Sequence, residues 1–190
     1  MNVLKIIINF VMDVLETITF VGSLFIVVYL FIMTPNQVKG ASMEPTFKSG
    51  DYILTSKITY KFRSIQRGDV IIFKSPKNPD IEYIKRVIGL PGDKIVITKG
   101  QVFLNDQPLN ENYTATITNV WENGFLKENE PFIVPENHIF VMGDNRMRSS
   151  DSRDFGPISI QSVDGLVFYR YFPPQKAGFI KNPFPKSLRN

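Results

Sequence analysis

The sequence has no cysteine and a single histidine, His138, among its 190 residues. The lack of cysteine excludes a disulfide framework, a cysteine nucleophile, thiolate zinc sites and iron–sulfur ligation. One histidine excludes a His-rich metal site and makes a histidine-based triad dependent on His138 alone. Any hydrolytic chemistry is therefore expected from serine, threonine, lysine, tyrosine or carboxylate side chains.

An excess of one charge is also lacking, because 22 Lys and Arg stand against 18 Asp and Glu, a formal net charge of +4. This balance is compatible with contact to an anionic phospholipid membrane, but it is too small to indicate a nucleic-acid partner, and none is expected. The length indicates one folded domain or two small ones around a single core.

The N-terminal segment differs from the rest, because all 13 prolines lie at Pro35 or later while apolar residues crowd before it. Thr17–Met33 (TITFVGSLFIVVYLFIM) carries no charge. As a helix it covers roughly 25 Å, the short end of a membrane span. We therefore expect residues 1–35 to be a membrane anchor. Two alternatives are a signal peptide cleaved at the weak pattern Val38-Lys39-Gly40 and a buried helix of a soluble domain.

Residues 36–190 predict one β-rich domain. Short β-branched or aromatic runs recur between Gly, Pro and Asn turn signals, and strands are expected at 52–57, 69–74, 82–90, 94–98, 101–104, 138–142 and 166–171. Runs such as VIIF do not alternate, which predicts strands buried on both faces. Residues 107–135 are polar and unpatterned, so the region around 99–136 is expected to be an insertion. The tail from Pro173 is expected on the surface.

Two dense segments contain a candidate nucleophile and a candidate base. Ser42 follows the apolar run in GASMEPT, where Pro45 restricts the turn; a plain linker turn is the alternative. In YIKRVIGLPGD, strand alternation places Lys85 and Arg86 on opposite faces, so one of them leaves water if the sheet packs on both faces. Burial lowers a lysine pKa, and a neutral amine can act as general base toward a serine hydroxyl. An exposed sheet face is the alternative there.

A third segment, GDNRMRSSDSRDFG at 143–156, holds three Arg, three Asp and three Ser directly after an apolar strand. Its position favours a supported polar network over a solvated loop, and a hydroxyl within it can fix the rotamer of a catalytic group.

Together with RGDVIIF at 67–73, these motifs resemble, in order and spacing, the bacterial type I signal peptidases. These are membrane-bound serine endopeptidases that remove signal peptides from exported preproteins, and the short single-anchor Gram-positive form is the most similar. The resemblance runs from the anchor to Gly156. It implies a mostly β fold, a catalytic core of coiled antiparallel β-sheets with a smaller inserted β region, preceded by one N-terminal transmembrane helix.

The resemblance implies that Ser42 is the nucleophile and Lys85 the general base of a Ser/Lys dyad with an acyl-enzyme intermediate, and that no metal or cofactor takes part. The backbone N–H of Ser42 is expected in the oxyanion hole, while Gly40 stands where some relatives carry a second donor, a serine. Supporting residues are implied as follows: Ser149 orients the Lys85 amine, Asp151 acts with Arg153 and Arg86, and Asp144 and Arg146 brace the end of the strand.

Further expectations concern substrate and location. Val38, Met43, Tyr83 and Ile84 are expected to wall the S1 and S3 pockets, which select preproteins with small residues at −1 and −3. The peptidase domain is expected on the extracytoplasmic side of a single-pass anchor. Met147 and Arg148 stand where some relatives carry Asp-Asn, and tolerance is expected there. A self-cleaving Ser/Lys regulator, a pilin-processing homologue and a binding domain without catalysis are the competing functions.

Overall fold

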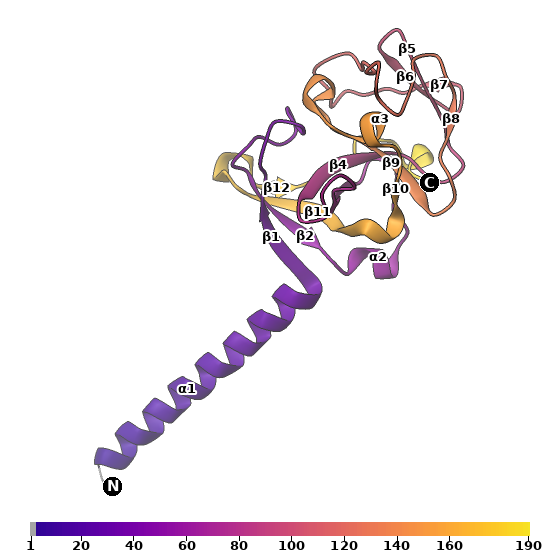
Figure 1. The fold of residues 1–190 in the computed structure, drawn as a ribbon. Coiled ribbons are helices and arrows are strands. Elements are labelled where there is room, and N and C mark those ends of the chain that lie inside the picture. Colours follow the sequence, from indigo (N-terminus) through magenta and orange to yellow (C-terminus); the bar gives the residue numbers. More distant parts are fainter. Residues whose placement is uncertain (1–2) are drawn as a thin grey trace.

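In the computed structural model, which describes residues 3–190, a long helix stands apart from a β-rich body (Figure 1). Helix α1, Val3–Val27, continues through a π-helical turn, Val28–Ile32. No residue of α1 is buried, and Val3–Ile32 is the one helix of the described chain that is long and apolar enough to cross a membrane. Such an exposed apolar surface suits lipid, so the alternative of a buried helix is contradicted.

The helix begins earlier than the uncharged run that starts at Thr17. Asp13 and Glu16 lie on one helix face and do not interrupt the backbone hydrogen bonds of α1. At its other end, the amide of Lys57 donates to the Ile32 carbonyl at 2.9 Å and the Lys57 amine to the Leu30 carbonyl at 3.4 Å. A lysine at a helix C-terminus satisfies carbonyls that have no partner within the helix, so the helix ends against the β-rich body.

The larger sheet has eight antiparallel strands in the order β1-β2-β11-β3-β4-β9-β10, with β12 paired to β11. The strands are β1 Met33–Gln37, β2 Tyr52–Ser56, β3 Val70–Lys74, β4 Glu82–Gly89, β9 His138–Met142, β10 Ile158–Ser159, β11 Val163–Phe172 and β12 Gly178–Phe179. The expected domain boundary at residue 35 falls inside β1, which pairs with β2 along its full length. Cleavage after Gly40 would remove this strand, which argues against a cleaved signal peptide.

The second sheet has four strands in the order β7-β6-β5-β8. They are β5 Lys94–Thr98, β6 Gln101–Leu104, β7 Gln107–Pro108 and β8 Phe132–Ile133, and the polar segment between β7 and β8 has no regular structure. This sheet lies at the end of the body away from α1 in Figure 1. It coincides with the expected insertion, except that it already begins at β5.

The central strand β3 is buried on both faces, as its non-alternating sequence predicts. Val70 and Ile72 belong to one apolar cluster, whereas Ile71 and Phe73 belong to another on the opposite face. Strand β4 pairs with β3 and is covered in the same way, so Lys85 and Arg86 are only 4% and 1% exposed. Both adjacent cations have therefore left water, not one of them.

Candidate active site

Ser42 lies on a turn that is fixed by backbone hydrogen bonds and by buried side chains. The Phe47 amide donates to the Met43 carbonyl at 2.8 Å, and the Glu44 amide donates to the Ala41 carbonyl at 3.2 Å. The side chains of Met43 and Phe47 are fully buried in the cluster under the turn. Met43 was expected to form a pocket wall, but it is a core residue. Because the core is closely packed, its burial fixes the position of the Ser42 turn relative to the sheet.

The amine of Lys85 lies 2.9 Å from Ser42 Oγ and also donates to the Ile84 carbonyl at 2.9 Å. Burial lowers the pKa of Lys85 from 10.5 to about 8; Asp151 and Asp144 raise that pKa, but by less than burial lowers it. With this lowered pKa, roughly a tenth of the Lys85 amine is neutral at pH 7, far more than for a lysine in water, and it lies within hydrogen-bonding distance of a hydroxyl.

Asp144 connects the strand of the lysine to the turn of the serine. It accepts from Arg86 Nε at 2.8 Å and Arg86 Nη2 at 2.6 Å, and from the Thr46 hydroxyl at 2.5 Å. The expected pairing of Arg86 with Asp151 is not the one formed, because alternation along β4 turns Arg86 toward Asp144. Asp144 therefore binds both Arg86, the neighbour of Lys85, and Thr46, at the far end of the Ser42 turn.

Asp151 braces the other side of the site with Arg153. It accepts from Arg153 Nε at 2.9 Å, from Arg153 Nη2 at 2.8 Å and from the Gly143 amide at 3.0 Å, and all of these groups are buried. It also caps the short helix α3, Ser152–Phe155, by accepting from the Arg153 amide. One carboxylate thus holds the loop after β9 and the start of α3.

The loop after β9 is attached directly to the turn that carries Ser42. The Asn145 amide donates to the Ser42 carbonyl at 3.0 Å, and Asn145 Nδ2 donates to the Ala41 carbonyl at 3.0 Å. A Cβ on Gly143 would overlap the Ser42 carbonyl oxygen and the Ser149 hydroxyl, so this position requires glycine. The sequence motif contains Asn145, but nothing in the pattern marks it as the contact to Ser42.

The hydroxyl of Ser149 is buried and, within residues 3–190, has no hydrogen-bond partner. The expected hydrogen bond from Ser149 to Lys85 is thus not formed in this structure. The Lys85 amine is directed instead toward Ser42 and the Ile84 carbonyl. The structure places Ser149 beside Gly143 at the edge of the dyad.

The unpatterned segment between β7 and β8 packs on three buried arginines near Ser42 and Lys85, namely Arg86, Arg146 and Arg153. Arg146, fully buried, donates to both oxygens of Glu111 and to the Thr118 hydroxyl. The Arg86 guanidinium lies 4.5 Å from the centre of the Tyr113 ring. The Arg153 guanidinium lies 4.5 Å from the centre of the Trp121 ring and donates to the Asn119 carbonyl. These contacts give the insertion a structural role at the site. The sequence did not predict this role, because its polar and aromatic residues are isolated and form no recognisable pattern.

A groove of about 940 Å³ opens over the dyad. Three of the four expected wall residues, Val38, Tyr83 and Ile84, line it together with Ser42 and Lys85. Ile53 and Ile72 add apolar surface, and the lining also includes charged side chains, among them Lys39, Glu82 and Arg148. The groove therefore presents a hydroxyl and an amine beside a narrow apolar wall.

Comparison with known proteins agrees with this geometry. The family model described as "Signal peptidase, peptidase S26" matches residues 11–172. The chain belongs to this family. The peptidase is 33% identical over 192 residues to Signal peptidase IB of Staphylococcus aureus strain COL, covering 94% of this chain and 98% of that relative. The resemblance stated from the motifs is thereby confirmed.

Two further relatives match a smaller share of this chain. Thylakoidal processing peptidase 1 of Arabidopsis thaliana is 34% identical over 152 residues, which cover 75% of this chain and 43% of that protein. A crystal structure of a signal peptidase I from Enterococcus faecalis V583 is 33% identical, covering 55% of this chain and 97% of that one, with a TM-score of 0.45. Family membership makes the chain a serine peptidase, supports cleavage of signal peptides from preproteins, and with α1 indicates a membrane-anchored enzyme.

Removing the charge of Glu111 tests the role of the insertion. In Glu111→Gln the buried Arg146 guanidinium loses its charge partner, and breaking one side of a buried pair costs about 3 kcal/mol. We expect a clear drop in the midpoint of thermal unfolding of the full chain in detergent, followed by circular dichroism. Glu130→Gln is the matched control, because Glu130 is exposed and forms no ion pair within the described residues. Equal unfolding midpoints for the two variants would contradict a stabilising role of the Glu111–Arg146 pair.

Burial of Lys85 predicts a pH-dependent gain in stability for Lys85→Met. Below pH 8 the folded protein must bury an ammonium group, whereas above pH 10.5 the lysine is neutral in the folded and unfolded states alike. The penalty is therefore fully present below the folded pKa, disappears as pH rises to the unfolded pKa, and amounts to about 3 kcal/mol. The difference in unfolding midpoint between Lys85→Met and the unaltered protein should shrink from pH 7 to pH 10. A constant difference would show that Lys85 is not desolvated.

Proposed function

We propose that the chain is a membrane-anchored endopeptidase in which Ser42 is the nucleophile and Lys85 the general base. The observation that carries this proposal is the 2.9 Å contact between Lys85 Nζ and Ser42 Oγ, made by a lysine that is 4% exposed. A lysine in water is a poor base near neutral pH because it is protonated. A desolvated lysine beside a hydroxyl is neutral often enough to accept its proton.

The chemical steps follow from this pair. The neutral Lys85 amine takes the Ser42 proton while Oγ attacks the scissile carbonyl carbon, and the Ser42 N–H donates to the developing oxyanion. The Lys85 ammonium then gives its proton to the departing amine, which leaves an ester on Ser42. Lys85, neutral again, removes a proton from water as the water attacks the ester, and the acid product leaves with both groups restored. The proposed steps use no metal or cofactor.

The groove supports an extended substrate with small side chains near the cut. Strand β9 joins β4 only from Arg86 onward, so among the described residues the Glu82–Lys85 part of β4 has a strand partner on one edge alone. A substrate backbone can pair with such an edge as an additional strand. The apolar wall of Val38 and Ile84 then faces alternate substrate side chains. We propose that it selects small residues at −1 and −3.

The anchor supports a location close to the membrane surface. Ser42 lies nine residues after Met33, the first residue of β1, and β1 follows directly on the helix. A signal peptide whose apolar part spans the membrane presents its cleavage site at the same level. We propose that the peptidase domain lies on the extracytoplasmic side, where the substrate emerges.

Substitution of either dyad residue should abolish activity. Purified full-length Ser42→Ala and Lys85→Ala, assayed on a defined preprotein, should each lose more than about 10³-fold in kcat/KM, because nucleophile and base act as one unit. Ser187→Ala and Lys99→Ala are the matched controls, because both residues are exposed and away from the groove. Substantial cleavage by either dyad variant would refute the assignment.

The pH profile should report the titration of Lys85. Since its pKa is lowered to about 8, the reactive neutral form accumulates as pH rises. We expect kcat/KM to increase nearly tenfold per pH unit well below pH 8 and to level off above it, with the fold checked at each pH. A rate unchanged from about pH 6 to 9 would argue against a lysine base.

A further inference from the structure

Arg148 is an exposed cation fixed beside the nucleophile. It lines the groove together with Ser42 and Lys39. Asn145, three residues before it, holds the Ser42 and Ala41 carbonyls, while Ser149, directly after it, is buried. Because the backbone is anchored on both sides, the guanidinium is confined to the part of the groove that the side chain reaches from this loop, although it faces solvent.

This cation has no ion-pair partner within residues 3–190, and neither has Lys39. The acidic residues of the same loop are already bound: Asp144 to Arg86, Asp151 to Arg153, and Asp154 to the Ser150 hydroxyl and Lys77, each of the last two at 2.6 Å. Glu44, on the nucleophile turn, is not part of the groove lining. The positive charge at this place is therefore not neutralised by the protein itself.

The charges of the groove are separated along its length. The groove acids, Asp80 and Glu82, lie on or just before β4; Glu82 accepts from Asn36 and stands opposite Lys74 in the pairing of β3 with β4. With two acids against Lys74, that end carries no excess of positive charge. The end at Ser42 carries Lys39 and Arg148 and no acidic lining residue, so it is positive.

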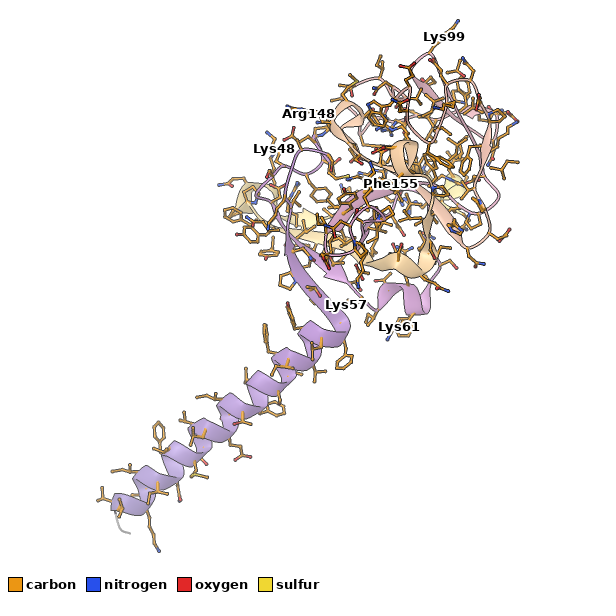
Figure 2. The ribbon with its side chains drawn as sticks, in the orientation of Figure 1. Lys48, Lys57, Lys61, Lys99, Arg148 and Phe155 are labelled. Atoms are coloured by element: carbon orange, nitrogen blue, oxygen red, sulfur yellow. The ribbon has the colours of Figure 1, made fainter. Side chains whose placement is uncertain are left out.

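The course of residues 35–42 along the groove indicates which part of a bound substrate lies at each end of the groove. The groove lining runs from Pro35, shortly after the helix, to Ser42. In Figure 2, Arg148 lies on the body far from Lys57, which marks the end of the helix. A signal peptide held in the membrane must enter at the Pro35 end. The residues that follow the scissile bond then leave past Arg148.

We propose that Arg148, assisted by Lys39, selects for a carboxylate side chain within the first three residues of the mature segment and disfavours a lysine there. This inference rests on the proposed cleavage of preproteins and adds a preference on the leaving side of the cut. An unpaired guanidinium in a groove attracts a carboxylate and repels an ammonium group over a few ångströms. Position 148, where tolerance was expected from the family pattern, becomes a determinant of substrate choice.

The test compares two preproteins that differ only at +2, one with Asp and one with Lys, cleaved by the same preparation of full-length enzyme in detergent. With the unaltered protein we expect kcat/KM to favour Asp by about fivefold at low salt, the size expected for exposed charge pairs. Since salt screens such pairs, the ratio should approach one at about 1 M salt. Arg148→Gln should bring the Asp-to-Lys ratio of kcat/KM close to one, and Arg148→Glu should reverse the preference so that Lys is favoured. Each ratio comes from one preparation, so differences in folded fraction cancel.

Two controls separate a local effect from general attraction. Lys99→Glu removes an equally exposed cation that Figure 2 places far from Arg148, and it should leave the ratio unchanged. Moving the Asp/Lys pair to +10, about 30 Å along an extended chain, should abolish the ratio. An equal ratio in Arg148→Gln and the unaltered protein, or a ratio that persists at +10, would overturn the inference. If the unaltered protein cleaves neither preprotein, the proposed function itself fails, and this inference with it.

Discussion

The structure depends on keeping the Lys85 amine out of water at 2.9 Å from Ser42 Oγ. The strand β4 that carries this lysine is covered on both faces, so the alternation of its side chains buries Arg86 on the other side as well. An arginine does not lose its charge when it is buried, so it needs a carboxylate. Asp144 supplies that carboxylate, and the covering of both faces of β4 thus leads to the first buried ion pair of the site.

The buried charges next to the dyad form a balanced set. Three arginines, at 86, 146 and 153, pair with Asp144, Glu111 and Asp151 respectively. Because each carboxylate is held by its own guanidinium, Asp144 and Asp151 only partly oppose the effect of burial, and the pKa of Lys85 still falls to about 8. A carboxylate without its arginine would stabilise the lysine as an ammonium ion. The arginines therefore help to keep the pKa of Lys85 low, which is the condition that the proposed Ser/Lys dyad requires.

The central part of this arrangement could be predicted from the sequence and the outer part could not. Dense motifs marked Ser42 and Lys85, and the non-alternating runs predicted strands covered on both faces. Glu111 and Tyr113 carried no signal, because their role depends on where an unpatterned segment folds back over distant arginines. The pairing of Arg86 with Asp144, and the burial of Met43, depend on side-chain direction at a curled sheet. A motif names the residues of a network but does not say which of them touch.

The anchor and the groove share one rigid element, which relates the membrane to the chemistry. Strand β1 follows the helix, spans roughly 17 Å and is paired throughout with β2. The strand β2 is followed by Lys57, which binds the last carbonyls of the helix. The height of Ser42 above the bilayer is consequently set by a paired strand and not by a flexible linker. In the proposed function, a substrate anchored in the same bilayer would meet Ser42 and Lys85 in a restricted register, so that shallow side-chain pockets would be enough to select the bond to be cut.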